Sequence, residues 1–387
     1  MRWPLIFAIC VPMFVGSSTF GPTKAARAEG DWEITPQSEE ALEKGLKWLA
    51  TNQGAEGNWE SNDLGLVGMG ALAFLSAGHM PGHGKYGTNV DKALGYILRN
   101  AKPSGLLNIS DQQRDMYNHG LATFVLGQAY GITNDQRFNA VLDKALKLTF
   151  QAQCRDGGWD YRSTPQDPAH GHDLSLVVMQ AKGIRSAVDS GLEVPPEVIQ
   201  MAIKSVREHY SSHGLPEAEA KKQPGQFTYS RGGGQSTLAL AAAGVVCLQE
   251  FAQYDDWRIA KNMDVIRASI KGKLGENGRQ VPRGFGHMQM DAYTLYYVGQ
   301  ALYQVGGKDW EECYPILRDS LIASQAKDAN QNRGADGAWT SDRVGGKGGQ
   351  LYGTSVACFI LAMPNRYLPI LQEGKIDSLK GKFQQKD

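Results

Sequence analysis

An internal repeat constrains the fold of this chain more strongly than any other feature of its sequence. The segments KGLKWLATNQ, at residues 44–53, and KALKLTFQAQ, at residues 144–153, align without a gap. Each runs into a Gly-x-Trp sequence that ends at Trp59 or Trp159, and a third Gly-x-Trp ends at Trp339. Because repeats with a period of roughly 50 residues form stacked supersecondary units, we predict that copies of one unit share a continuous core.

Two classes of helix alternate along the repeats. Residues 44–53, 92–100, 144–153 and 202–210 carry apolar residues at the i, i+3, i+4 spacing of an amphipathic helix. The segments between them are apolar on every side: residues 65–75, 121–131, 174–184, 236–248, 293–305 and 354–363. Helices without a polar face are buried, so we predict an inner ring of these helices inside an outer ring of amphipathic ones. The predicted fold is all-α, an α/α toroid of about six helical hairpins.

A polar residue that can cap a helix accompanies the start of each apolar segment. These residues are Asp63, Asn118, Asp173, Ser236, Asp291 and Thr354. If all six cap inner helices, the positive ends of six helix dipoles point to one mouth of the ring and favour an anionic or electron-rich ligand. The repeat register also predicts matching places for Gly45, Ala145 and Leu317 on outer helices, and for Gln128, Gln180 and Gln300 on inner ones.

The start of the chain differs from the repeats and has the features of an export signal. Arg2 precedes an apolar run at residues 4–16, and the tripeptide Ala-Arg-Ala at residues 26–28 forms a small-x-small cleavage site. The run is shorter than the roughly 17 to 25 residues of a membrane-spanning helix, and no later apolar run reaches that length. We therefore expect a signal peptide over residues 1–28 and a secreted or periplasmic protein in which residues 29–387 form a single toroid domain.

Charge and cysteine content bear on the class of partner. Lys plus Arg and Asp plus Glu both total 40, so no net charge attracts nucleic acid or anionic lipid. The four cysteines after the export signal lack the CxxC spacing of a metal site. Cys247 and Cys358 lie in apolar helical segments, where a buried free thiol is the ordinary state, although an even count in an exported chain also permits disulfides.

The repeated motif resembles that of a known family. The segment KGLKWLATNQGAEGNW, at residues 44–59, resembles the QW motif of squalene and oxidosqualene cyclases, and residues 153–159 and 335–339 carry related endings. The resemblance implies a terpenoid cyclase-like α/α toroid of the kind that prenyltransferase β subunits share. In that family the Gln bonds to a helix end and the Trp packs over the neighbouring repeat. The resemblance therefore implies a structural role for the motif.

The catalytic motifs of those families are absent. A cyclase of the hopene type needs a DxDD acid that protonates an olefin, but the only consecutive aspartates here are Asp255 and Asp256 in YDDW. A prenyltransferase β subunit binds zinc through Asp, Cys and His, and none of the four later cysteines has the corresponding Asp-x-Cys context. The resemblance extends to the scaffold and leaves open whether the chain is an enzyme.

Six residues are candidates for a binding site at the rim of the central cavity. They are His119, His172, Asp173, Arg231, Asp291 and Tyr352. They belong to different repeats, so only a closed ring of inner helices brings them together. His170 and His172 also have the His-x-His spacing of a weak metal-site candidate, whereas a role of Asp173 as a helix cap is the plainer interpretation. No cofactor is predicted.

Three classes of function remain open. The first is binding of a ligand, such as an isoprenoid or a glycan, or of a protein partner through the cavity or its rim, with no catalysis demonstrable from the sequence. The second is an enzyme: a cavity lined by rings such as Tyr293, Tyr296 and Tyr297 favours isoprenoid cyclase-like chemistry, and an open cleft with Arg, Lys and carboxylates favours glycan lyase-like chemistry. The third is a structural component of the cell envelope with a filled centre.

Overall fold

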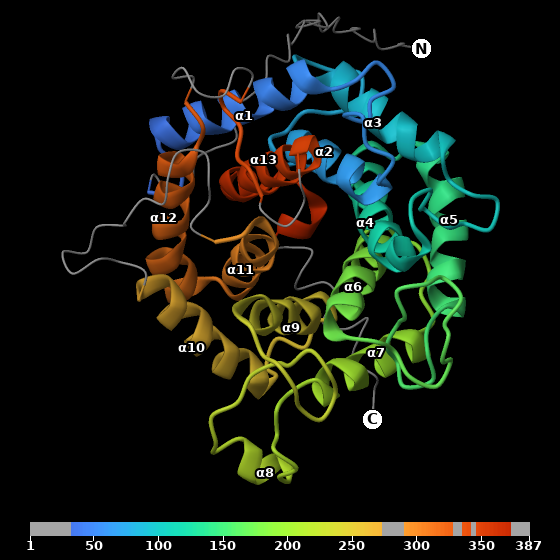
Figure 1. The fold of residues 1–387 in the computed structure, drawn as a ribbon, viewed down its shortest axis with the longest axis vertical. Helices are drawn as coiled ribbons and strands as arrows, with labels where there is room; N and C mark the ends of the chain where they lie inside the picture. The colour runs from blue at the N-terminus through green and yellow to red at the C-terminus, as the bar shows by residue number, and fades with distance from the viewer. Residues whose placement is uncertain (1–31, 273–289, 328–334, 342–345, 373–387) are drawn as a thin grey trace, which may run out of the picture.

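The computed structural model describes residues 32–272, 290–327, 335–341 and 346–372, so the predicted export signal lies outside the described residues. Long helices alternate between an outer and an inner ring (Figure 1). The outer helices are α1 (Pro36–Asn52), α3 (Gly87–Arg99), α5 (Gln136–Gln151), α7 (Pro196–Glu208), α10 (Trp257–Lys271) and α12 (Gly307–Ser324). The inner helices are α2 (Leu64–Ser76), α4 (Asp115–Thr133), α6 (Leu174–Asp189), α9 (Leu238–Glu250), α11 (Ala292–Val305) and α13 (Gly346–Ala362). The short elements are α8 (Glu217–Ala220), η1 (Gln112–Arg114), η2 (Met363–Asn365) and η3 (Pro369–Leu371).

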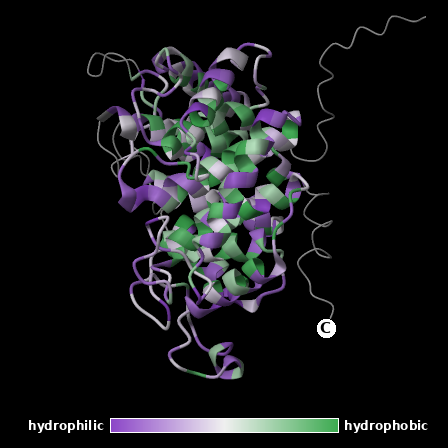
Figure 2. Cartoon of the chain, turned by 90° about the vertical axis from the view of Figure 1, so that its right-hand side faces the viewer, coloured by the Kyte–Doolittle hydropathy of each residue, from purple (hydrophilic) through white to green (hydrophobic). Residues whose placement is uncertain are grey.

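The inner ring forms the core of the molecule. Each inner helix packs against the next, and α13 packs against α2, so the ring is closed. In Figure 2 the apolar residues gather along the middle of the molecule and the polar residues lie in the peripheral loops. Across the described ranges the chain forms only isolated β-bridges besides its helices. The predicted all-α toroid of about six helical hairpins is confirmed. The prediction succeeded because helices buried on all sides are apolar all round, whereas outer helices are apolar on one face.

The N-terminal ends of the inner helices lie together at one opening of the ring, which we call the mouth. Tyr117, in the first turn of α4, shares a hydrogen bond with Ser175, in the first turn of α6. Arg114, just before α4, pairs with Asp63, which caps α2, at 3.1 Å. The inner helices are therefore parallel, and their ends form a second opening that we call the base.

The repeated Gln and Trp residues join outer helices head to tail. At the end of α1, the amide nitrogen of Gln53 donates to the carbonyl of Asn89, in the first turn of α3, at 3.0 Å. The indole nitrogen of Trp59 donates to the carbonyl of Leu49 at 2.8 Å. The same bonds recur around Gln153 with Trp159 and around Gln325 with Trp339. We call each set a Gln–Trp staple, and its bonds fit the structural role expected for the motif.

Glycine is required at the turn inside each staple. Gly57, Gly157 and Gly337 have φ angles of 93°, 85° and 84°, a region that other residues rarely adopt. A Cβ at each would overlap a backbone carbonyl of the neighbouring outer helix. Gly105, with φ 91°, makes the same close approach to Lys144 after α3, although no Trp follows it. The repeat therefore has a fourth copy that the Gly-x-Trp pattern does not reveal.

Three of the six predicted caps are confirmed and three are wrong. Asp63, Asp173 and Asp291 accept hydrogen bonds from N–H groups in the first turns of α2, α6 and α11. Asn118, Ser236 and Thr354 do not cap inner helices. Two of these side chains have other partners: Asn118 donates to Asn108 at 2.9 Å, and the hydroxyl of Thr354 accepts from the N–H of Trp339 at 3.0 Å. Thr237 caps α9 in place of its neighbour.

The predicted layers are confirmed. Gly45, Ala145 and Leu317 lie on the outer helices α1, α5 and α12, and Gln128, Gln180 and Gln300 lie on the inner helices α4, α6 and α11. The glutamines do not share one height in the ring. Gln180 donates to the carbonyl of Met116 at the start of α4 (2.7 Å), whereas Gln128 donates to Ser186 near the end of α6 (2.8 Å).

The cysteines of the described repeats lie in the core as free thiols. Cys154, Cys247, Cys313 and Cys358 are all buried and free, so no disulfide links the described repeats. This confirms the free thiols expected at Cys247 and Cys358. Within the described ranges, every helix is too short or too polar to cross a membrane.

A buried ionic network lies in the ring between the mouth and the base. The ammonium of Lys182 on α6 donates to Glu250 on α9 at 3.1 Å and to Gln300 on α11, and the side chains of Lys182 and Glu250 are 0% exposed. Burial lowers the pKa of Lys182, and the charge of Glu250 opposes that shift.

At the base, the N–H of Ile370 donates to Gln128 at 3.0 Å and Tyr303 donates to the carbonyl of Leu371 at 2.6 Å. The segment around η3 therefore covers this end of the ring.

Candidate functional site

The densest group of polar and aromatic side chains at the mouth surrounds the buried carboxylate of Asp173. This side chain caps α6 by accepting from the N–H of Ser175 at 2.8 Å. Its second oxygen accepts from the hydroxyl of Tyr161 at 2.5 Å and lies 3.2 Å from Nδ1 of His172. Asp173 is 1% exposed, so these partners replace the water that an aspartate normally has. We call Tyr117, Tyr161, His172, Asp173 and Tyr229 the mouth cluster.

Aromatic rings form one wall of the mouth cluster. The rings of Tyr117 and Tyr161 stack with centroids 5.7 Å apart, and the ring of His172 meets that of Tyr161 edge-on at 4.5 Å. The ring of Tyr229 meets that of His172 edge-on at 6.2 Å, and its hydroxyl is 2.8 Å from that of Tyr161. Three segments supply these rings: the start of α4, the loop before α6 and the loop before α9. An aromatic wall of this kind offers ring faces and edges that suit a sugar ring or an unsaturated hydrocarbon.

Burial keeps two tyrosine hydroxyls of the mouth cluster protonated. Burial raises the pKa of Tyr161, and the neighbouring carboxylate of Asp173 raises it further. Burial also raises the pKa of Tyr117. Both hydroxyls therefore remain protonated donors at neutral pH. The side chain of His172 is 49% exposed, so solvent and a ligand can reach its imidazole.

The cluster extends across the mouth to α11 and α13. Tyr293, in the first turn of α11, meets the ring of Tyr297 edge-on at 5.0 Å and lies close enough to Tyr117 to raise its pKa. Tyr352 of α13 lies near Tyr296 and Tyr297 and raises the pKa of both hydroxyls, after burial as the main cause. Asp291 caps α11 two residues before Tyr293. His172, Asp173, Asp291 and Tyr352 thus belong to elements that meet at the mouth.

His119 lies outside the mouth cluster. Its side chain is 0% exposed between α4 and α5, where Nδ1 accepts from the N–H of Leu107 at 3.2 Å and Nε2 lies 3.1 Å from the carbonyl of Ala145. These partners fix the neutral tautomer with its proton on Nε2. Burial lowers the pKa of His119 to about 4. The residue serves the packing of the fourth repeat copy, the one around Gly105.

Arg231 also lies beside the cluster and not within it. Its guanidinium pairs with Asp156, and the same carboxylate accepts from the N–H of Gly171 at 2.8 Å. Gly171 directly precedes His172. The ion pair therefore fixes the loop that carries His172, and burial lowers the pKa of Arg231.

The metal-site candidate does not assemble around its two histidines. His170 is 72% exposed and pairs with Asp167, whereas His172 faces Asp173. Over the described part of the chain, no three His, Cys, Asp or Glu side chains are placed to hold a metal ion. The two histidines are neighbours in sequence with separate partners.

A polar cavity occupies another sector of the mouth, beside α2 and α13. It has a volume of about 380 Å³, and its wall includes Glu60, Asp63, Asp111, Arg114 and Lys347. At its edge the backbone of the consecutive residues Trp59 and Glu60 has φ angles of 51° and 60°, which is unusual for residues other than glycine. Charged groups of both signs thus line the mouth next to the aromatic wall.

Sequence reasoning missed three members of the mouth cluster. Tyr117 lies in the first turn of α4, whereas Tyr161 and Tyr229 lie in the loops that lead to α6 and α9. The available signal was their position: Tyr161 follows a Gly-x-Trp by two residues, and Tyr229 lies in the polar segment that precedes an apolar run. Aromatic residues in such polar connections lie near the rim of the ring.

Comparison with known proteins identifies the fold. No protein-family model matches the chain, and no curated protein is detectably similar in sequence. An α-1,6-mannanase, GH76A of Salegentibacter sp. HEL1_6, is similar in structure with a TM-score of 0.56 at 12% identity, over 84% of this chain and 99% of that one. A GH76 mannosidase of Bacteroides thetaiotaomicron has a TM-score of 0.53 at 10% identity, over 85% and 97%. A type II terpene cyclase from Scytonema has a TM-score of 0.51 at 13% identity, over 86% and 98%. The chain therefore has the α/α-toroid fold that GH76 mannanases and type II terpene cyclases share.

Proposed function

We propose that this protein is a glycan-processing enzyme that acts at the mouth of the toroid, with His172 as general base and Asp173 as the residue that orients it. The observation that carries the proposal is the dyad itself: a half-exposed imidazole whose Nδ1 lies 3.2 Å from a fully buried carboxylate. A buried carboxylate holds a neutral imidazole with its proton on Nδ1, which leaves Nε2 as the acceptor. Among the described residues, Nε2 of His172 has no hydrogen bond, so it is available to a substrate.

The lining of the mouth favours a glycan over an isoprenoid. Glu60, Asp111 and Lys347 offer donors and acceptors that match sugar hydroxyls, and the ring of Tyr229, 37% exposed, offers a flat surface. An isoprenoid chain offers no hydrogen-bonding group to Asp111 or to the exposed ion pair of Glu60 and Lys347.

The chemistry that fits the dyad is β-elimination from a uronic acid unit. Nε2 of His172 takes the proton next to the sugar carboxylate, and the electron pair forms a carbon–carbon double bond. The adjacent carbon–oxygen bond breaks, and the leaving oxygen takes a proton from water. Asp173 keeps the imidazole in place and stabilises its cationic form, while Tyr161 stays protonated and holds Asp173.

The mannanase comparison favours elimination over hydrolysis by consecutive aspartates. That mannanase is described in inactive variants with two consecutive aspartates replaced, in complex with α-1,6-mannotriose. The only consecutive aspartates of this chain are Asp255 and Asp256, outside the inner ring. The side chain of Asp256 is 3% exposed and is held by Arg207 and Arg258. It is occupied as the cap of α10.

The test is to incubate the protein with polyuronates and neutral glycans and to follow ultraviolet absorbance, which only the conjugated product of elimination acquires. We expect His172→Ala to lower the rate by about a hundredfold or more, because general-base catalysis contributes about 10² to 10⁴. His170→Ala is the matched control, since it is exposed two residues away and should leave the rate unchanged. Equal rates for both variants, or reducing ends without absorbance, would reject elimination by His172.

Binding without catalysis and isoprenoid cyclisation are the alternatives. The buried rings of Tyr296, Tyr297 and Tyr352 favour the second, and conversion of an isoprenoid but of no glycan would support it.

We further infer that the repeat is of the squalene-cyclase type, that residues 29–387 form one domain, and that the protein is exported after removal of residues 1–28. Mass spectrometry of the cellular protein should find Glu29 at its N-terminus, and an intact residue 1 on cytoplasmic protein would contradict export.

A further inference from the structure

The second Gln–Trp staple differs from the first in the length of the segment that follows it. After Trp59 the chain reaches the cap of α2 in four residues, whereas after Trp159 it takes fourteen to reach the cap of α6. The longer segment, residues 160–172, carries Tyr161 and His172 of the mouth cluster, and we call it the insertion. Two side chains of the mouth cluster therefore lie on a segment that the first copy of the repeat does without.

The end of the insertion packs directly on the turn of the second staple. The N–H of His172 donates to the carbonyl of Trp159 at 2.8 Å. A Cβ on Gly171 would lie 2.6 Å from the Cα of Gly158, so the two backbones are in contact and leave no room for a side chain. The last two residues of the insertion thus have a fixed place on the staple.

The carboxylate of Asp156, in the staple turn, holds this contact from both sides. Its Oδ2 and Oδ1 accept from the N–H of Gly171 at 2.8 Å and 3.0 Å. The Oδ1 atom also accepts from the N–H of Gly158 at 3.0 Å. The side chain of Asp156 is 13% exposed, so water competes weakly for these bonds.

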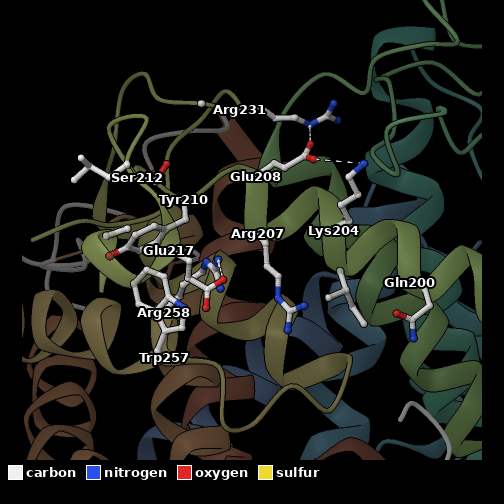
Figure 3. A pocket seen from close by; sticks show the side chains of 14 residues that line it. Gln200, Lys204, Arg207, Glu208, Tyr210, Ser212, Glu217, Arg231, Trp257 and Arg258 are labelled. Atoms are coloured by element: carbon white, nitrogen blue, oxygen red, sulfur yellow. Dashed lines mark ion pairs between the residues drawn. The ribbon is translucent and has the colours of Figure 1, made fainter. Parts of the chain in front are cut away.

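Arg231 supplies the counter-charge to Asp156. Its guanidinium pairs with that carboxylate and lies 4.0 Å from Glu208, at the end of α7, as Figure 3 shows for Glu208. The pair offsets the cost of burying the carboxylate. Arg231 follows Tyr229 by two residues, so the pair also joins the insertion to the loop that carries this tyrosine of the mouth cluster.

The first staple provides an internal reference for Asp156. The matching residue is Glu56, which also stands three positions before the Trp of its staple. Its side chain is 74% exposed and lies 3.6 Å from Arg99 in a loose pair. The same position of the repeat thus carries a surface charge in one copy and binds the end of the insertion in another.

We propose that Asp156 is a positioning residue for His172. It holds Gly171, the residue before His172, and so keeps Nδ1 of the imidazole at Asp173 and leaves Nε2 for a substrate. The ring of His172 also meets that of Tyr161 edge-on, so its packing depends on where the insertion lies. The role of His172 as a base rests on the proposed function, whereas the placement of its ring rests on these contacts alone.

The test observes the imidazole of His172 by nitrogen NMR of the whole protein without substrate, at about pH 8.5, where an ordinary imidazole is neutral. Comparison with His172→Ala assigns the signals. In the wild type we expect the proton on Nδ1, because Asp173 accepts there. In Asp156→Ala the two nitrogen shifts should move towards each other, as in a mixture of tautomers.

Two further variants separate positioning from folding and from charge. Asp156→Asn keeps an oxygen that can accept from the same N–H groups, so it should restore the wild-type shifts. Gly171→Ala keeps the carboxylate but pushes the insertion off the staple, so it should mix the tautomers as Asp156→Ala does. Glu56→Ala is the matched control and should leave the shifts of His172 unchanged.

Turnover of a polyuronate gives a second readout. In Asp156→Ala and Gly171→Ala, kcat should fall about tenfold to a hundredfold, because a displacement of about 1 Å can cost about a hundredfold in rate. The KM should stay within about threefold, since the rest of the mouth is unchanged. In Asp156→Asn, kcat should stay within about threefold of the wild type.

The outcomes keep this inference apart from the proposed function. Wild-type shifts in Asp156→Ala would overturn the inference, and so would tautomer mixing in Asp156→Asn equal to that in Asp156→Ala. If Asp156→Ala does not fold, Gly171→Ala and Asp156→Asn decide by the same shifts. A wild-type protein that acts on no polyuronate would reject the proposed function, while the NMR comparison would still decide the role of Asp156.

Discussion

At the scale of single residues, the glycine of the Gln–Trp staple shows how a close approach fixes a residue type. Gly157 and Gly191 have similar φ angles, 85° and 79°. A Cβ on Gly157 would overlap the carbonyl of Met201, whereas a Cβ on Gly191 would have no atom within 4 Å. The two positions therefore differ in crowding and share the same backbone conformation.

We predict that Gly157→Ala lowers the free energy of unfolding by about 3 kcal/mol or more, because backbone strain and a steric overlap add. Gly191→Ala should cost only about 1 to 2 kcal/mol, the penalty of a left-handed conformation for alanine. Denaturation by urea measures both. Equal costs would show that the neighbouring helix yields to the added methyl group.

His119 gives the fold a dependence on acid. Its pKa is lowered by burial from 6.5 to about 4, so between these values the unfolded chain binds a proton that the folded chain does not. The stabilisation is fully present above pH 6.5 and is lost as the pH falls towards 4, and it amounts to about 3 kcal/mol. We expect the free energy of unfolding to fall over this window. In His119→Gln, which keeps one donor and one acceptor, the pH dependence should be smaller by that amount, and an unchanged slope would contradict the assignment.

The histidines also show what a sequence can predict at this scale. His119 and His172 both precede or enter an apolar run, and the pattern gives them the same candidate role. The structure distinguishes them by depth, because α4 begins at Asp115 and carries His119 into the ring, whereas His172 lies before the start of α6. Depth depends on where a helix starts, which hydrophobic periodicity determines least well.

At the scale of the element, the glutamine of each staple hydrogen-bonds the end of one outer helix to a backbone carbonyl of the next. Gln325 is 6% exposed and donates to Ala41 at 2.8 Å and to Gly337 at 2.9 Å, whereas Gln53 is only half-buried. We predict that Gln325→Ala lowers the free energy of unfolding by about 2 to 3 kcal/mol, because two buried carbonyls lose their donor. Gln53→Ala should cost about 1 kcal/mol, since water can replace the lost bonds. Thermal unfolding of the two variants would show equal losses if burial at the staple were irrelevant.

Most of the elements could be predicted from the sequence, and the exceptions have physical causes. The all-apolar runs reveal the inner helices because burial on every side leaves no polar face. The start of α13 could not be predicted, because GKGGQ at residues 346–350 contains three glycines, which are poor helix formers. The copy at Gly105 was missed because a leucine, Leu107, stands where the other copies have Trp. Two of the cluster tyrosines, Tyr161 and Tyr229, lie in connections, where no periodicity exists to place them.

At the scale of the whole molecule, the network around Lys182 ties three inner helices together across the ring. Lys182→Met removes the nearer of two cations from the buried carboxylate of Glu250 and leaves only Arg185, at 3.9 Å, so we predict that it lowers the free energy of unfolding by about 3 kcal/mol. The double variant Lys182→Met with Glu250→Gln should recover part of that loss, because it removes the carboxylate that has lost its nearer cation. A double-mutant cycle measured by urea denaturation checks this, and strictly additive losses would show that the two side chains are not coupled.

The closure of the outer ring has a consequence for how the chain is made. The bond from Gln325 to Ala41 joins residues 284 positions apart. At a synthesis rate of about 5 to 20 residues per second, the ribosome makes α1 roughly 15 to 60 s before it makes Gln325. During that interval Gly45, which packs against Cys358 and Trp339 in the finished ring, lacks these partners from the end of the chain. The nascent chain is thus an open arc in which part of α1 stays uncovered, and α12 and α13 close the ring last.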